Sequence, residues 1–439
     1  MSIKVNFFVA VLLPLCVIGQ PSAVVDSYIK QAIESNETLK QQNYRQQKAI
    51  LSLAEAKKMF LPDANFGVTY TLAAGGRKID FPIGDLLNPV YGTLNQLTAS
   101  NSFPTVENQS LTLLPNNFYD ARFRVTVPIW STELQYLKLI RTRQIDLPNI
   151  ESAVLRRELT KDVKTAYLNF LQANEVISIY EQGLTLLAEG KRVTESLIRN
   201  DMATASQLIR IQGDIAEVEA QKVESAGNVL KSTAYHNFLC NQPLNTPIVL
   251  DSNLVTMPQS PETITTSGRA ELTQFDAGAG ILKLLTEMQQ KFYRPKVGAQ
   301  LDLGSQAFNF KWGGYALLGL SAEIPLWDNR RHELRVQQAQ IDEQILSSQR
   351  AQIVEQLNLQ ANLAHQTLST KLDQYALFPP QIAGVNRAYR DVLRLYKEGK
   401  ASYIELLDAR TQVTNLSLRQ TLARYQAWVA FVELERAVE

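Results

Sequence analysis

Glu405 and Asp408, three residues apart, are the carboxylates whose spacing most suggests chemistry in this sequence. They follow a glycine turn in the stretch LYKEGKASYIELLDAR (395–410), which places both on one face of a helix that begins there. Such a pair could attract cations, take part in acid–base catalysis or cap the helix. A similar stretch, LIRNDMATASQLIRIQ (197–212), carries Gln207 and Arg210 at the matching positions, so the pair is not repeated.

No catalytic partner accompanies these carboxylates. His236, His332 and His365 lie far apart in the sequence and give no metal-ligand spacing. Neither a glycine-rich phosphate loop nor a nucleophile elbow is present. The sequence therefore predicts a protein that is not an enzyme and that binds no cofactor or catalytic metal.

The N-terminal residues predict an exported protein. Lys4 precedes an apolar run at 7–15, and small residues follow at 19–23, which is the pattern of a secretory signal peptide over 1–23. Cys16 could be lipidated, although Leu15 stands where a small residue is wanted. Removal of this segment leaves Cys240 alone, which excludes an internal disulfide.

Charge excludes one class of partner. The 439 residues include 44 basic and 43 acidic side chains, a net charge of +1, so there is no basic field for nucleic acid. After the N-terminal segment, no apolar run approaches the roughly 20 residues of a membrane-spanning helix.

The chain is an internal repeat. FLPDANFGVTYT (60–71) resembles YRPKVGAQLDLG (293–304) at an offset of 233, whereas FRVTVPIW (123–130) resembles LSAEIPLW (320–327) at an offset of 197. The first copy therefore carries about 36 extra residues within 73–117, a Gly-, Asn-, Pro- and Leu-rich loop. The predicted organisation is a first repeat at 24–240, a linker at 241–268 and a second repeat at 269–439.

Each repeat predicts two strands, near 62–72 and 119–129 in the first and near 295–304 and 314–326 in the second. Apolar and polar residues alternate along them, as in strands with lipid on one face and water on the other, or as in a soluble sandwich. Four strands cannot close a lipid-exposed barrel. If these strands meet lipid, several chains must share one barrel. The polar face would carry four charged side chains: Arg122, Arg124, Asp302 and Glu323.

Very long helices fill the rest. From Ser131 to Arg199 the only expected break is Pro148, and 155–187 shows the three-to-four spacing of a coiled-coil seam. Pro379 and Pro380 must interrupt the corresponding helix of the second repeat. The shorter helices, about 24–60 and 203–240, would stack end to end beside the long one.

The order of these features resembles the TolC-like outer-membrane efflux protein family over nearly the whole mature chain. The resemblance rests on the repeat, the strand entries at Pro62 and Pro295, the VPIW and IPLW strand exits, and the turn YKEGKASYIELLDA. It implies a mixed α/β membrane protein: a homotrimer whose four strands per chain form a 12-stranded outer-membrane β-barrel, joined to a long periplasmic α-helical coiled-coil barrel. The implied function is a passive exit duct of a tripartite efflux or type I secretion system, working with a periplasmic adaptor and an inner-membrane pump. No particular cargo is implied.

The resemblance also assigns roles to residues. Glu405, Asp408 and Tyr396 match the gate at the periplasmic tip, although Ser402 with Glu405, and Thr204 with Gln207, would also form capping boxes. Two tethering positions of the family carry Ala401 and Gln207 here, so Lys400, Arg210 or Arg410 would have to replace them. The candidate adaptor contacts are the turn residues Arg199, Asn200, Asp201, Met202, Glu398, Gly399 and Lys400. The charged barrel residues would face the pore. The 73–117 insertion would lie outside the cell as a cap, a partner site or a lattice contact.

A rival interpretation is an exported coiled-coil scaffold or adaptor that never inserts into the membrane, with the strands forming a small soluble sandwich.

Overall fold

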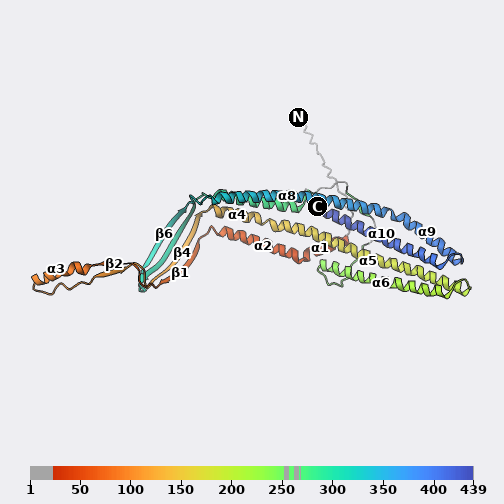
Figure 1. Ribbon diagram of the computed structural model, residues 1–439, viewed down its shortest axis with the longest axis horizontal. Coiled ribbons are helices and arrows are strands. Elements are labelled where there is room, and N and C mark those ends of the chain that lie inside the picture. Colours follow the sequence, from red (N-terminus) through yellow and green to blue (C-terminus); the bar gives the residue numbers. More distant parts are fainter. Residues whose placement is uncertain (1–22, 252–256, 262–265, 267, 439) are drawn as a thin grey trace, which may run out of the picture. The chain divides into compact units, whose positions relative to one another are not determined.

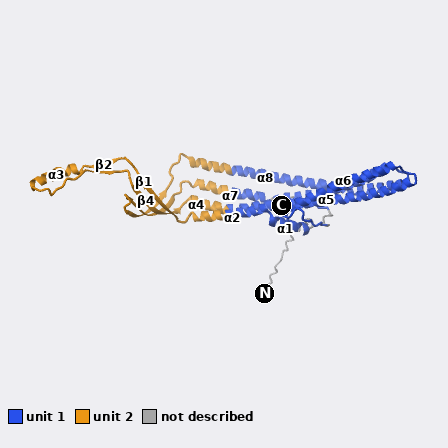
Figure 2. Ribbon diagram, turned by 90° about the horizontal axis from the view of Figure 1, so that it is seen from below, with its two compact units in different colours: residues 1–48, 144–280, 343–439 blue, residues 49–143, 281–342 orange. Residues whose placement is uncertain are grey.

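The computed structural model describes residues 23–251, 257–261, 266 and 268–438. The predicted signal peptide up to residue 22, including Cys16, lies outside this range. The described chain folds into two compact units, residues 1–48, 144–280 and 343–439, and residues 49–143 and 281–342 (Figure 2). Both units are discontinuous in sequence, as expected if each repeat contributes to both.

The elements follow one another as the repeat predicts (Figure 1). The helices are α1 (Ala23–Ser35), α2 (Glu37–Lys58), α3 (Ile83–Leu97), α4 (Thr132–Gln144), α5 (Leu147–Arg199), α6 (Ala205–Leu239), α7 (Ala270–Gln290), α8 (Arg331–Ala376), α9 (Phe378–Lys397) and α10 (Tyr403–Val438). The strands are β1 (Asp63–Thr71), β2 (Lys78–Phe81), β3 (Gln109–Thr112), β4 (Phe118–Trp130), β5 (Lys296–Phe308) and β6 (Gly314–Glu323).

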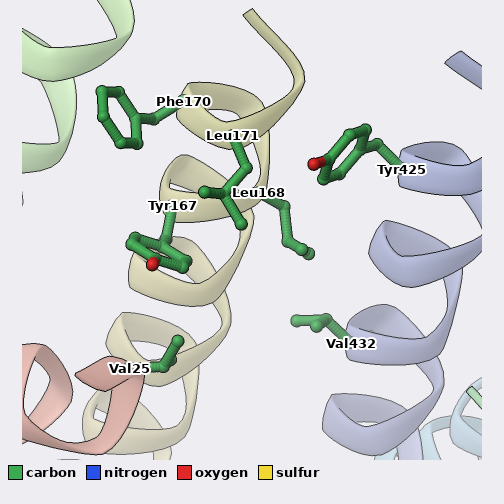
Figure 3. Packing of buried hydrophobic residues seen from close by; sticks show 7 residues of the cluster. All are labelled: Val25, Tyr167, Leu168, Phe170, Leu171, Tyr425 and Val432. Atoms are coloured by element: carbon green, nitrogen blue, oxygen red, sulfur yellow. The ribbon is translucent and has the colours of Figure 1, made fainter. Parts of the chain in front are cut away.

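The first unit is built around α5, whose 53 residues extend about 80 Å at 1.5 Å per residue. The predicted seam is its buried face, with Leu159, Val163, Ala166 and Phe170 all less than 8% exposed. Side chains from α1, α5 and α10 meet in one core cluster, in which Val25 and Val432 approach α5 from separate helices (Figure 3). Apolar stripes of this kind are stable only when neighbouring helices cover them.

The two short helices meet end to end, as predicted. The Ser35 hydroxyl at the end of α1 donates a hydrogen bond to the carbonyl of Cys240, just after α6, over 3.2 Å. Proline sets the breaks in the long helices: α5 begins one residue before Pro148, and α9 begins one residue before Pro379. A proline in the first turn lacks an N–H that the helix would leave unpaired, so each proline starts a new helix there.

The second unit holds an antiparallel sheet in the order β1-β4-β5-β6. All four predicted strands are confirmed, and β5 runs four residues beyond its predicted end, to Phe308. β1 and β6 each have one strand neighbour in the described chain, so both outer edges of this sheet are open. Open edges leave backbone N–H and C=O groups available to another strand.

The faces of the sheet differ in polarity. Register pairs Phe66 with Phe123, and Leu301 with both Val125 and Leu318, so apolar side chains lie across all four strands. These side chains are not covered within the chain: Phe66 is 71% exposed and Leu318 is 73% exposed. The opposite face carries Arg124 and Asp302, which are also register partners.

The insertion at 73–117 is not the irregular loop that the sequence suggests. β2 pairs with β3, and α3 lies between them. Its glycines and prolines led to the prediction of a loop, but Pro89 is accommodated inside α3. Among the described residues, no helix combines the length and apolarity that a transmembrane helix requires.

Candidate functional site

Two helix–helix turns of the first unit lie against each other. A Cβ atom at Gly399 would come within 2.5 Å of the Met202 side chain, so the α9–α10 turn contacts the α5–α6 turn. Both turns have one backbone geometry: Asp201 (φ 56°) and Gly399 (φ 68°) are left-handed, and these are the residues that the repeat aligns. In both, the next N–H returns to the preceding helix, from Met202 to Leu197 at 2.8 Å and from Lys400 to Leu395 at 2.9 Å.

Four helices converge beneath the turns in a cluster that we call the tip core. It consists of Val193, Leu197, Ile211, Tyr389, Tyr396, Tyr403 and Leu406. Three of its seven members are tyrosines, and a buried tyrosine hydroxyl needs a partner. Two of these hydroxyl groups, those of Tyr396 and Tyr403, have partners that join the two helix hairpins, whereas the Tyr389 hydroxyl has none among the described residues.

Tyr396, a predicted gate residue, is 2% exposed. Its hydroxyl lies 2.6 Å from the Thr194 hydroxyl, which links α9 to α5. Burial raises the pKa of Tyr396, so the group stays neutral at physiological pH. Tyr396 is thus a buried connector between the two helix hairpins.

A second connector was not predicted from the sequence. Tyr403 donates a hydrogen bond to Asp214 over 2.5 Å, linking α10 to α6. Burial, together with the Asp214 carboxylate, raises the pKa of Tyr403. The sequence gives no sign of this pair, because a tyrosine at a helix start and an aspartate within a helix are both common and their spacing does not indicate contact.

A third connector is ionic. Glu189 on α5 accepts hydrogen bonds from Nε and Nη2 of Arg192, both at 2.9 Å, and pairs with the ammonium of Lys397 on α9 at 2.8 Å. These hydrogen bonds lower the pKa of Glu189 to about 2. The carboxylate is therefore ionised at any physiological pH.

The three suggested replacements for the family's tethers do not form these connections. Lys400 pairs with Glu398 inside its own turn at 2.7 Å, and Arg210 is exposed. Arg410 is 8% exposed, and its Nε has no hydrogen-bond partner among the described residues. Burial lowers the pKa of Arg410, although Asp214 and Tyr403 favour its charge.

Glu405 and Asp408 are both exposed at the start of α10. The predicted capping box exists there: the Ser402 N–H donates to Glu405 at 2.9 Å, and the Glu405 N–H donates to the Ser402 hydroxyl at 3.3 Å. Asp408 is outside the box and accepts a hydrogen bond from Gln412 at 2.8 Å. Its exposed charge has no capping role.

The matching box in the first repeat was predicted wrongly. The side chain of Thr204 makes no capping bond and instead lies 2.9 Å from the Ser206 hydroxyl. The side-chain oxygen of Gln207 is buried with no hydrogen-bond partner among the described residues. The Ser206 hydroxyl competes for the Thr204 hydroxyl. The capping-box motif considers only Thr204 and Gln207, so it does not take this competition into account.

On the polar face of the sheet, Arg124 and Asp302 form a bidentate ion pair at 2.8 and 2.7 Å. The structure joins Arg122 to Asp120 at 3.2 Å, a partner that the sequence had not singled out. Glu323 lies at the end of β6, in register with Lys296. Three of the four predicted charged residues thus lie in the interior of the sheet, and one lies at its edge.

The remaining candidates for chemistry are structural. No group of three or more potential metal-ligating side chains occurs in the part of the chain that the structure describes. Burial raises the pKa of Cys240 to about 11, so its thiol is protonated and unreactive at neutral pH. His332 pairs with Asp328 at 2.9 Å and stacks on Phe292.

Comparison with solved structures decides the fold. The outer membrane protein VceC from Vibrio cholerae superposes over 94% of this chain and 95% of its own, with a TM-score of 0.70 and 14% sequence identity. CusC matches with a TM-score of 0.75 and 14% identity, over 94% of this chain and 92% of its own. The open-state MtrE outer membrane channel of Neisseria gonorrhoeae matches with a TM-score of 0.71 and 13% identity, over 94% of this chain and 88% of its own.

The chain has the TolC-like fold. No protein-family model matches the sequence, and no curated protein does. Its mixed architecture is mostly helical with a small sheet. Comparison of structures establishes this fold although the sequence identity to the similar structures is too low for the sequence comparisons to find a match.

Proposed function

We propose that the chain is one subunit of a homotrimeric outer-membrane channel, the exit duct of a tripartite efflux or type I secretion system. Three copies of the sheet would form a 12-stranded barrel, and the helices would form the periplasmic duct. A periplasmic adaptor would deliver cargo from an inner-membrane pump. The solved structures of similar fold include proteins described as outer-membrane channels.

The observation that carries this proposal is a sheet that is open at both edges and apolar on one face. The edges β1 and β6 need strand partners, because unpaired backbone groups in lipid cost several kcal/mol each. Lipid would cover the apolar face of the sheet, on which Phe66, Leu318 and Leu320 are 71%, 73% and 77% exposed. Further copies of the same sheet satisfy both needs.

The helical unit also leaves room for neighbours. On α6, Ile209, Val223 and Leu230 are each about 70% exposed, and they are separated by multiples of seven residues. A seven-residue apolar repeat is the pattern of a coiled-coil contact, here with another subunit. The same helix uses its other face, including Ile211 and Val218, to pack within its own chain.

The proposed gate lies at the paired turns. Glu405 and Asp408 from three chains would place six carboxylates around one axis, which would attract cations and repel one another. Closure then requires links that resist this repulsion. The connectors Tyr396–Thr194, Tyr403–Asp214 and Lys397–Glu189 supply them in each subunit. The exposed turn residues 199–202 and 398–400 remain our candidates for contact with the adaptor.

The ion pairs of the sheet would face the pore. Arg124, Asp302, Arg122 and Asp120 share the face opposite the apolar one, and charge is favoured on the water-filled side of a barrel. Their pairing leaves the proposed pore wall charged but locally neutral. Such a wall would pass solutes of either sign.

The test is the state of the protein in the cell envelope. Outer membranes extracted in mild detergent should yield a trimer that migrates as one band unheated and as a monomer after boiling. Single-channel current in planar bilayers should accompany the trimer. A soluble monomer would instead support the rival proposal of an exported scaffold that does not insert.

A further inference from the structure

Helix α3, between β2 and β3 in the 73–117 insertion, carries an apolar stripe that its own chain leaves uncovered. Ile83, Leu86, Val90 and Leu97 are 38%, 69%, 53% and 79% exposed. Their spacings of three, four and seven residues, with Thr93 between the last two, are those of a coiled-coil seam. A solvated helix has no need of such a stripe.

The side of α3 that faces away from the stripe is already covered by its own chain. The returning segment 101–108 is fixed to it by reciprocal side-chain bonds, from Asn88 to Val106 at 2.9 and 2.8 Å and from Asn95 to Phe103 at 2.8 and 3.1 Å. At Gly84 a Cβ atom would come within 2.4 Å of the Val106 carbonyl oxygen, so the backbones are in close contact. These contacts fix the rotation of α3, and the stripe cannot turn inward.

The stripe is not a continuation of the lipid-facing surface of the sheet. The ribbon β2–β3 separates them, and its exposed residues include Lys78 and Asp80. The twelve steps from Thr71 to Ile83 can span up to about 40 Å at 3.3 Å per residue. A bilayer that covers the sheet would therefore not have to reach α3.

The β2–β3 ribbon, which carries α3, is continuous with the strands that would join subunits. It begins directly after β1, an open-edge strand, and Thr71 is still paired with Phe118 at its base. The Ala73 N–H then bonds Asn116 at 3.1 Å, and the Leu113 N–H bonds Arg77 at 2.9 Å, so the pairing carries on toward α3 (Figure 1). Copies joined edge to edge in the sheet would hold their α3 helices together.

We infer that the seam of α3 packs against the α3 helices of the other subunits, forming a short parallel three-helix bundle beyond the strand ends Thr71 and Phe118, opposite the ends that join α2 and α4. This inference rests on the proposed trimer. The composition of α3 favours identical partners, because its one charged residue, Asp85, lies off the seam and bonds Asn108 at 3.0 Å. Three identical seams therefore meet without like charges in contact. The bundle narrows the external mouth of the channel.

The test uses single cysteines and a short bismaleimide on the detergent-extracted protein; Cys240, being fully buried, leaves the parent chain unlabelled. Val90→Cys and Leu86→Cys place a thiol in the seam. Gly92→Cys is the matched control, because it is exposed on the far side of the same helix with nothing within 4 Å. The seam variants should give a cross-linked pair holding about two thirds of the chains, since one of three thiols around an axis stays unpaired. The control should stay monomeric on a denaturing gel.

The outcomes separate this inference from the proposed function. If unheated samples migrate as trimers but the seam variants cross-link no more than Gly92→Cys, the bundle is wrong and the channel proposal stands. If the seam thiols link to a different protein, identified by the mass of the product, the stripe binds a partner other than a second copy of this chain and the three-helix bundle is wrong. If no trimer is present, both proposals fail.

Discussion

The hydroxyl of Tyr403 lies 2.5 Å from the carboxylate of Asp214. This hydrogen bond ties the first residue of α10 to α6. A hydrogen bond to an ionised group contributes about 1.5–3 kcal/mol. If the two hairpins separate when the channel opens, this bond opposes opening.

Tyr403→Phe should therefore weaken closure. We expect a larger open fraction in single-channel recordings, because the phenyl ring keeps the packing of the tip core and loses the link to Asp214. Tyr389→Phe is the matched control: Tyr389 is equally buried, but its hydroxyl has no hydrogen-bond partner among the described residues. Equal open fractions for the two variants would remove Tyr403 from the gate.

The architecture was largely predictable from the sequence. Repeat offsets, strand alternation and the two proline interruptions each depend on local rules, and the structure has all of them. The turn geometry was predictable for the same reason, since Asp201 aligns with Gly399 and both are left-handed. The exception is the insertion, where an apolar helix is stabilised by asparagine bonds to a segment about 10 to 20 residues away.

The connectors of the tip were not predictable. Each joins residues about 190–210 positions apart, and neither periodicity nor spacing reports which polar groups meet over such separations. The sequence suggested Lys400, Arg210 or Arg410 as replacements for the lost tethers. The two hairpins are instead joined through Asp214 on α6 and Glu189 on α5.

The charges of Glu405 and Asp408 can be separated from the capping box. Glu405→Gln with Asp408→Asn retains an acceptor for the Ser402 N–H but removes both charges. We expect block of the channel by divalent cations to weaken, as it should for Glu405→Ala with Asp408→Ala. The alanine pair should also lose about 0.5–2 kcal/mol of local helix stability through the missing cap. Unchanged block in both pairs would leave Glu405 with its capping role alone and would remove Asp408 from the proposed gate.

The Arg124–Asp302 ion pair gives a prediction for the sheet. Asp302 is 4% exposed, and its loss would leave a guanidinium without its bidentate partner. Asp302→Asn should destabilise the folded protein, seen as a lower temperature for trimer dissociation in unheated-gel assays. Glu323→Gln, at the exposed end of β6, is the control and should stay within about 0.5 kcal/mol of the parent.

A pH dependence follows from Glu271, which joins α7 to α10 by bonding Arg269 and Arg436 at 2.7 Å. Burial by itself would raise the pKa of Glu271, but hydrogen bonds from the two guanidinium groups outweigh burial and lower the pKa to about 2. A carboxyl group with a depressed folded-state pKa stabilises the fold above its unfolded pKa and loses that contribution as the pH falls through the folded value. Glu271→Gln should therefore lower the thermal midpoint at pH 7, and the gap from the parent should shrink between about pH 4.5 and pH 2. A gap that does not change over this range would contradict an ionic role.

Gly399 allows backbone strain to be separated from steric contact between the turns. With φ at 68°, alanine at this position would cost about 1 kcal/mol in backbone energy alone, and its Cβ would also meet the Met202 methyl group at 2.5 Å. We expect Gly399→Ala to lower the thermal midpoint of the helical circular dichroism signal. In a Met202→Ala background the steric part disappears, so the same substitution should cost only the backbone part. Because the Met202 methyl group ends a flexible, 55% exposed side chain that can turn aside, the two penalties should be nearly equal. A clearly smaller penalty in the Met202→Ala background would show that this methyl group is held against the α9–α10 turn.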